Sequence, residues 1–129
     1  MIKMALFGCG RIGRLHAQNI SQNQGAELVQ VYDVHQLSAD QLATRHNCEV
    51  ALSVEVILAN SDIDAVLIGT STDTHADLIE ESAKAGKAIF CEKPIDLSLE
   101  RVKQCAATIA PYNVPVQIGF NRRFDPSHK

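Results

Sequence analysis

The sequence predicts an α/β fold built on a doubly wound, mostly parallel sheet. Short apolar runs typical of strands alternate regularly with segments of helical spacing, and the run at 64–70 has no polar residue between Asp64 and Thr70. A continuously apolar strand is expected where helices cover both faces of a parallel sheet. Strands separated by helices imply right-handed crossovers, and therefore one sheet with helices on both sides.

Six strands and five helices are expected in strict alternation along the chain. The strands are expected at 2–8, 27–33, 48–51, 64–70, 88–92 and 114–120, and the helices at 11–22, 38–46, 53–60, 73–86 and 98–110.

Side-chain patterns suggest how two of these helices are oriented and capped. The first helix is expected to turn inward a stripe formed by Ile12, Leu15, Asn19 and Ile20. Ser38 precedes a helical run, and its hydroxyl is expected to cap that helix.

Composition narrows the classes of partner. With 12 Lys and Arg against 15 Asp and Glu, the net charge of −3 argues against a nucleic-acid partner recognised through bulk charge. No apolar run approaches the roughly 20 residues needed to cross a bilayer, and the start lacks a signal peptide. We therefore expect a cytoplasmic protein with no membrane partner.

The four cysteines are scattered and form no C-x-x-C pair, so neither a metal site nor a disulfide framework is expected. Cys9 would lie beside a helix amino terminus, where thiolates are stabilised. A packing role is nevertheless favoured for Cys9, because its small side chain suits a crowded loop.

The glycines near the amino terminus predict a phosphate site. Gly8, Gly10 and Gly13 have the spacing G-x-G-x-x-G, after an expected strand and at the start of an expected helix. The first permits a tight turn, the second lets the backbone approach a diphosphate, and the third lets helix and sheet pack closely. The amides of Arg11 and Ile12 would then point at the phosphates, helped by the helix dipole.

An acidic residue follows at the position that a dinucleotide site requires. Asp33 ends the second expected strand, twenty positions after Gly13, where a carboxylate can accept hydrogen bonds from the adenosine ribose. Its charge would repel a 2′-phosphate, and Val34 and His35 provide no arginine to hold one. NAD is therefore favoured over NADP. The alternative, in which the glycines only pack and Asp33 only shapes a turn, stays open.

Two further clusters follow the fourth and fifth expected strands. After 64–70, the hydroxyls of Thr70 and Ser71 either cap the next helix or touch a cofactor, and spacing alone favours capping. His75 is interpreted, again from spacing alone, as a helix-face residue. Glu92 and Lys93 end the fifth strand, either as a surface ion pair or with the lysine in a cleft, where it could bind a substrate hydroxyl.

Three segments in this order resemble the Gfo/Idh/MocA oxidoreductase family, and among its members the inositol 2-dehydrogenases and related polyol or sugar dehydrogenases. They are GCGRIGRLH, TSTDTHADLIEESAKAGKAIFCEKPIDL and QIGFNRRFDP. The resemblance covers essentially the whole chain. It implies a Rossmann NAD(P)-binding domain, followed in family members by a domain that supplies substrate contacts and often the oligomer interface.

The resemblance also implies roles for individual residues. Lys93 matches the lysine of the family's E-K-P turn, which contacts the substrate hydroxyl and the nicotinamide region. The cofactor-lining segments match Thr70, Ser71, His75 and Glu92, and the segment near the substrate matches Asn121, Arg122 and Arg123.

The family's general base and its Asp neighbour lie further along, in the second domain, and no residue of this chain matches them. We therefore expect a dinucleotide-binding domain at 1–120, the start of a truncated substrate domain at 121–129, and the rest of that domain absent from this chain. The whole enzyme would transfer a hydride to NAD from a secondary alcohol of a polyol or sugar, with myo-inositol at its 2-position as the first candidate.

For this chain alone, the resemblance implies cofactor binding without appreciable turnover, and a homo-oligomer is expected. Two alternatives stay open: a stand-alone NAD-binding module with a regulatory or redox-sensing role, and a fragment of an NADP-dependent sugar dehydrogenase.

Overall fold

The computed structural model describes residues 1–93 and 95–119. Its centre is a six-stranded sheet with the order β3-β2-β1-β4-β5-β6, in which every neighbouring pair is parallel. This confirms the predicted doubly wound α/β fold. The strands are β1 (Ile2–Phe7), β2 (Ala26–Tyr32), β3 (Glu49–Val50), β4 (Ala65–Ile68), β5 (Ala88–Cys91) and β6 (Val116–Ile118).

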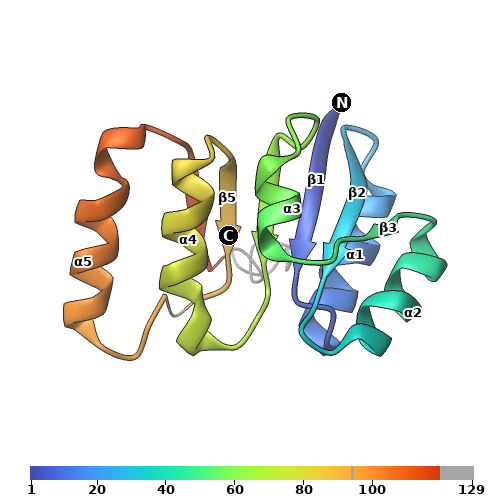
Figure 1. The fold of residues 1–129 in the computed structure, drawn as a ribbon, viewed down its shortest axis with the longest axis horizontal. Coiled ribbons are helices and arrows are strands. Elements are labelled where there is room, and N and C mark those ends of the chain that lie inside the picture. Colours follow the sequence, from blue (N-terminus) through green and yellow to red (C-terminus); the bar gives the residue numbers. More distant parts are fainter. Residues whose placement is uncertain (94, 120–129) are drawn as a thin grey trace, which may run out of the picture.

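Helices cover both faces of the sheet. In Figure 1, α4 and α5 run side by side over one face, with α3 further along. On that face lie α3 (Val54–Ala59), α4 (His75–Lys84) and α5 (Leu99–Ile109), and on the opposite face lie α1 (Arg11–Gln22) and α2 (Gln36–His46). Two 3-10 turns, η1 (Thr72–Thr74) and η2 (Ala110–Tyr112), complete the described elements. Within residues 1–93 and 95–119, no helix has the length and apolar character needed to cross a membrane.

Two cores explain why the buried parts of the central strands, Met4–Phe7 of β1 and Ala65–Ile68 of β4, are apolar at every position. Along β1, Met4 and Leu6 pack with α1 and α2, whereas Ala5 and Phe7 pack with the helices of the other face. Successive side chains of a strand point to opposite faces, so a sheet covered on both sides buries all of them. All four residues of β4 are buried for the same reason.

The strand order places the candidate site. β1 and β4 are neighbours at the centre of the sheet, and their following helices lie on opposite faces. At such a switch point the connections diverge and leave a crevice outside the carboxyl ends of the strands. The glycine loop after β1 and the segment after β4 therefore meet at one edge.

The orientation of α1 differs from the expected one. Ile12 and Leu15, expected to face inward, are 40% and 50% exposed. The buried face instead consists of Gly13, His16, Ala17 and Ile20. Gly13 lies directly against the backbone of Gly8, so this close contact determines which side of α1 faces the sheet.

The start of α2 also differs from the expectation. The helix begins at Gln36, with His35 as its N-cap residue, so Ser38 lies inside the first turn and does not cap it. The Ser38 hydroxyl is instead 2.8 Å from Nδ1 of His35. Asp33 accepts a hydrogen bond from the His35 amide, which turns the chain into the helix earlier than the serine position indicates.

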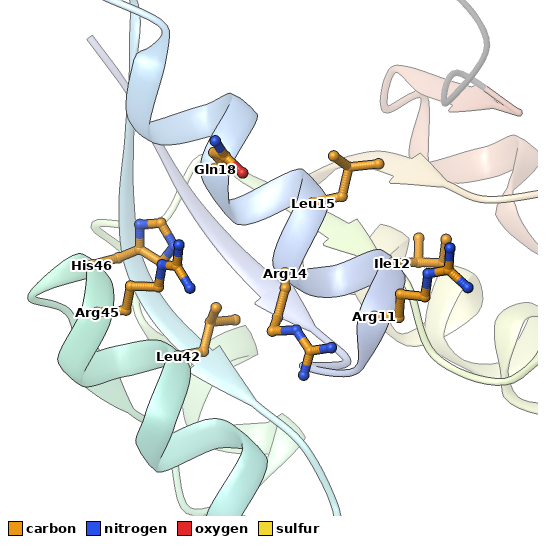
Figure 2. Close-up of a pocket in the computed structure, with 8 residues that line it drawn as sticks. All are labelled: Arg11, Ile12, Arg14, Leu15, Gln18, Leu42, Arg45 and His46. Carbon is orange, nitrogen blue, oxygen red and sulfur yellow. The ribbon is translucent and has the colours of Figure 1, made fainter.

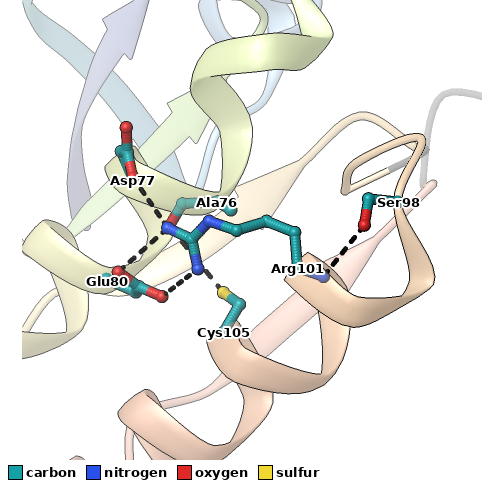
Figure 3. Close-up of polar contacts among 6 residues, drawn as sticks. All are labelled: Ala76, Asp77, Glu80, Ser98, Arg101 and Cys105. Carbon is teal, nitrogen blue, oxygen red and sulfur yellow. Dashed lines mark hydrogen bonds and ion pairs between the residues drawn. The ribbon is translucent and has the colours of Figure 1, made fainter.

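A polar cluster joins α4 to α5 (Figure 3). The Arg101 guanidinium donates to both carboxylate oxygens of Glu80, at 2.6 and 3.1 Å, and to Asp77 at 2.7 Å. Beside it, the buried Cys105 thiol lies 3.7 Å from the Ala76 carbonyl oxygen. These hydrogen bonds to Glu80 and Asp77 raise the pKa of Arg101 above its already high usual value.

Replacing Arg101 with Met should remove this link and lower the free energy of unfolding by about 1 kcal/mol, the upper end for partly exposed ion pairs. The loss should shrink in high salt, because salt screens exposed charges. Urea denaturation at two ionic strengths measures both effects. Lys103→Met, at an exposed position of the same helix, is the matched control and should change stability by less than about 0.5 kcal/mol.

Candidate dinucleotide site

The glycine loop contains two tightly packed glycines and one open one. Gly8 has a φ of 101°, and a Cβ there would lie 2.6 Å from the carbonyl oxygen of Gly69. A Cβ on Gly13 would lie 1.9 Å from the Gly8 carbonyl oxygen, which no side chain can tolerate. A Cβ on Gly10 would meet no protein atom within 4 Å. The open space over Gly10 is where a ligand can approach the backbone.

The first turn of α1 can bind an anion with its amides. Gly10 is the N-cap residue and has no side chain to accept from the first turn, which carries no acidic residue. The first amides of a helix have no partner within it, so those of Arg11 and Ile12 can donate to a phosphate. The helix dipole adds a favourable field for negative charge.

The side chains of Arg11 and Ile12 belong to a different part of the surface. Figure 2 shows them on the first turn of α1, with Arg14 also on α1 and Arg45 beside His46 on α2. Together these side chains line an open hollow of about 700 Å³, whose lining shares no residue with that of the cavity beside Gly10. Neither residue lines the cavity beside Gly10, so their side chains are not placed to hold a ligand there, and only their amides at the start of α1 remain as donors.

Asp33 is held in a fixed orientation beside the glycine loop. Its Oδ2 accepts from the Cys9 amide at 2.7 Å, and its Oδ1 accepts from the His35 amide at 2.8 Å. Each carboxylate oxygen can accept a further hydrogen bond. Asp33 is therefore oriented at the end of β2 with acceptor capacity left for a ligand's hydroxyls.

Cys9 has the packing role that its small size indicates. The side chain is buried, and its thiol lies 3.7 Å from the Tyr32 carbonyl oxygen. Burial, together with the nearby Asp33 charge, raises the pKa of Cys9 to about 12. The thiol is therefore neutral at ordinary pH and is not activated by the helix amino terminus.

Two adjoining cavities lie at this edge of the sheet. One, of about 260 Å³, is lined by Gly8, Gly10, Tyr32, Asp33, Val34, Gly69, Thr70, Ser71 and Thr74. The other, of about 120 Å³, shares Tyr32, Asp33 and Val34 with it and adds Gln36, Val50, Ala51 and Leu52. The structure thus brings the glycine loop, Asp33, Thr70 and Ser71 together, as the sequence predicts.

Val34 and Leu52 are site residues that sequence reasoning missed. They are 88% and 83% exposed and line the smaller cavity, next to Asp33. Exposed aliphatic side chains at a cavity mouth offer apolar surface to a flat ring. An isolated exposed aliphatic residue carries no sequence signal, because such residues are common on any protein surface.

The hydroxyls after β4 bond to one another and do not cap a helix. Thr74 Oγ1 donates to the Ser71 carbonyl oxygen at 2.7 Å, so the 2.6 Å contact between the hydroxyls of Thr70 and Thr74 requires Thr70 to donate. α4 begins after η1 with no side-chain cap, so the expectation of capping is wrong. His75 is a buried helix-face residue, as expected, and its Nε2 lies 3.0 Å from the Thr70 carbonyl oxygen.

Glu92 and Lys93 do not form a surface ion pair. Glu92 is buried at the end of β5, and its carboxylate pairs with Nε2 of His16 from α1. Lys93 is exposed at the carboxyl edge of the sheet. Sequence reasoning missed His16, although its spacing from Gly13 and Ile20 places it on the same helical face.

Asn121, Arg122 and Arg123, expected near the substrate, lie outside the described residues.

Comparison with known proteins agrees with this geometry. The model of the family described as "Oxidoreductase family, NAD-binding Rossmann fold" matches residues 2–120. The chain belongs to this family. NAD is thus the cofactor of this fold. The open space over Gly10 and the oriented Asp33 carboxylate suit a dinucleotide of this kind.

Similar family members include inositol dehydrogenases. The chain is 51% identical to inositol 2-dehydrogenase of Rhizobium meliloti over 97% of its length, and 40% identical to scyllo-inositol 2-dehydrogenase (NAD(+)) of Bacillus subtilis over 98%. It superposes with a TM-score of 0.90 on scyllo-inositol dehydrogenase from Lactobacillus casei with bound NAD(H) and scyllo-inositol, at 36% identity and 98% coverage. In each comparison the chain spans 38% of the length of the protein it matches.

Gly10→Ala should separate cofactor binding from folding. The backbone of Gly10 (φ −77°) accepts an alanine, and the new methyl group meets no protein atom, so stability should change by less than about 0.5 kcal/mol. The methyl group would occupy the ligand's space, and NADH should bind at least about tenfold more weakly by calorimetry.

Gly13→Ala is the contrasting variant, because its methyl group meets the Gly8 carbonyl. It should lower the free energy of unfolding by about 3 kcal/mol or more. Unchanged NADH affinity in Gly10→Ala would contradict the placement of the diphosphate.

Proposed function

We propose that this chain is the cofactor-binding part of an NAD-dependent polyol dehydrogenase, with myo-inositol, oxidised at its 2-position, as the first candidate substrate. The observation that carries the proposal is the meeting, at one edge of the sheet, of the open Gly10 backbone, the oriented Asp33 carboxylate and the exposed Lys93. The names of the relatives support the polyol class.

The site residues would divide the cofactor between them. The amides of Arg11 and Ile12 would bind the diphosphate at the start of α1. Asp33 would accept hydrogen bonds from the adenosine ribose, and the exposed Val34 and Leu52 would contact the adenine ring. Thr70 and Ser71 line the same cavity and would contact the cofactor further along.

The charge at the end of β2 favours NAD over NADP. Both oxygens of Asp33 already accept backbone hydrogen bonds, which hold the carboxylate in place at the end of β2. A 2′-phosphate would lie against this carboxylate, and like charges at contact distance are strongly unfavourable in a partly buried site. The described loop after β2 provides no arginine, since Val34, His35 and Gln36 follow Asp33.

Lys93 is the proposed catalytic residue of this part of the enzyme. Its ammonium can donate a hydrogen bond to the substrate hydroxyl and stabilise negative charge that develops on the oxygen. When bound, NAD accepts the hydride from the carbon that carries this hydroxyl. The proton needs a general base, and both His16 and His75 are buried in hydrogen bonds to other protein groups. We therefore propose that the base lies outside this chain's described residues, as the resemblance implies.

A homo-oligomer is also proposed. β6 is an edge strand of the sheet, and Val116 at its start is 36% exposed. Exposed strand edges with apolar side chains favour association between chains.

Asp33→Asn should weaken the preference for NAD over NADP. The amide keeps one oxygen acceptor but loses the charge, so NADH should bind about tenfold more weakly, while NADPH binding should change little or improve. Parallel titrations with NADH and NADPH give the ratio. The matched control is Asp62→Asn. Asp62 is exposed and precedes β4, at the amino-terminal edge of the sheet and away from the candidate site, so the affinities for NADH and NADPH should both stay unchanged. A wild-type preference for NADPH would contradict the assignment.

A polypeptide of residues 1–129 should bind NADH but not turn over. Loss of the general base alone costs about 10²–10⁴ in rate, and the substrate also lacks its other contacts. Absorbance of NADH, followed with NAD and myo-inositol, measures the residual rate. Inositol-dependent NADH formation that disappears in Lys93→Met would show that this polypeptide is itself a dehydrogenase, since a contaminating enzyme would not respond to that substitution.

A further inference from the structure

A buried polar contact joins the two ends of the proposed site. His16 lies on α1, and its ring pairs with the Glu92 carboxylate, directly after β5. The exposed fractions of the two residues are 1% and 9%. The contact therefore spans from the helix that would bind the diphosphate to the residue that precedes Lys93.

The turn that carries Lys93 is held on its other sides as well. The Glu92 amide donates to the Ile68 carbonyl at the end of β4, at 3.2 Å, and the Gly119 amide donates to the Cys91 carbonyl at 2.9 Å. A Cβ on Gly119 would lie 3.0 Å from Cδ of Lys93, so the lysine stem packs directly over this glycine. His16 supplies the side-chain link from this turn to α1.

We propose that the His16–Glu92 pair positions Lys93 relative to the amino terminus of α1. The pair would thereby set the distance between the diphosphate site and Lys93, which the nicotinamide half of the cofactor must span. This inference rests on the proposed function. The diphosphate and the nicotinamide ring are covalently joined, so a site that fixes one must place its contacts to the other at a matching distance. Errors of about 1 Å in such positioning can cost about 10²-fold in rate.

Stability alone gives a poor account of this pair. Replacing a buried charged or polar pair with apolar residues of similar volume is often neutral or stabilising, because burial strips both groups of water. Two leucines would fill this space between α1 and β5 without that cost. A polar pair adds direction, since a hydrogen bond fixes the distance and angle between its partners more narrowly than apolar contact does.

The test compares two ligands that differ at the nicotinamide end. ADP-ribose contains the adenosine and the diphosphate but lacks nicotinamide, whereas NADH contains all three. In the 129-residue chain, Glu92→Asp keeps the charge but shortens the reach to His16 by one methylene. We expect NADH to bind about fivefold to tenfold more weakly and ADP-ribose to change less than about twofold, by calorimetry.

Two further variants separate geometry from charge and from folding. Glu92→Gln keeps the reach and loses the charge, so it should weaken NADH binding less than Glu92→Asp does. The double variant His16→Leu/Glu92→Leu removes the pair with apolar packing, and circular dichroism should show that it still folds. Its NADH affinity should fall by at least as much as that of Glu92→Asp, with ADP-ribose affinity again retained.

The outcomes distinguish this inference from the proposed function. Equal losses for NADH and ADP-ribose, or wild-type NADH affinity in Glu92→Asp, would overturn the positioning role while leaving the cofactor site in place. A wild-type chain that binds neither ligand would overturn the proposed function itself, and the positioning role with it.

Discussion

The close approach of α1 to the turns after β1 and β4 is the constraint on which the site depends. Gly13 lies against the Gly8 carbonyl, and Gly8 in turn lies against Gly69 at the end of β4. Without side chains at these points, three backbone segments pack more closely than any other residue allows. The amides of α1 are thereby held at the sheet edge, over a crevice that the diverging helices leave open.

Side chains then fix the loops that this packing brings together. Asp33 holds the Cys9 amide, His75 lies at hydrogen-bond distance from the Thr70 carbonyl, and His16 pairs with Glu92. Each contact links the segment after one strand to another part of the site. Loops at the ends of strands are ordinarily the most mobile part of a fold, and these hydrogen bonds limit that freedom before a ligand is bound. Such preorganisation lowers the ordering cost of binding.

Local patterns predicted some features of the site and not others. The spacing of the glycines and Asp33 predicted the crevice, because each feature depends on residues close in sequence and on one strand–helix–strand unit. The facing of α1 was predicted wrongly, since the exposed Ile12 and Leu15 are more apolar than the small residues that actually face the sheet. Ser38 was assigned as a cap because a serine before a helical run is a common start signal, but Asp33 starts the helix from further upstream.

By itself, the sequence determined the alternation of elements, the covered parallel sheet and the candidate dinucleotide site. These follow from apolar periodicity and from backbone conformations that only glycine adopts freely, and both are local properties. Tertiary structure alone decided that Glu92 pairs with His16 and that Val34 and Leu52 flank the site. His16 and Glu92 are 76 positions apart, and the packing of α1 against the sheet brings them into contact. A local sequence pattern contains no information about such a contact.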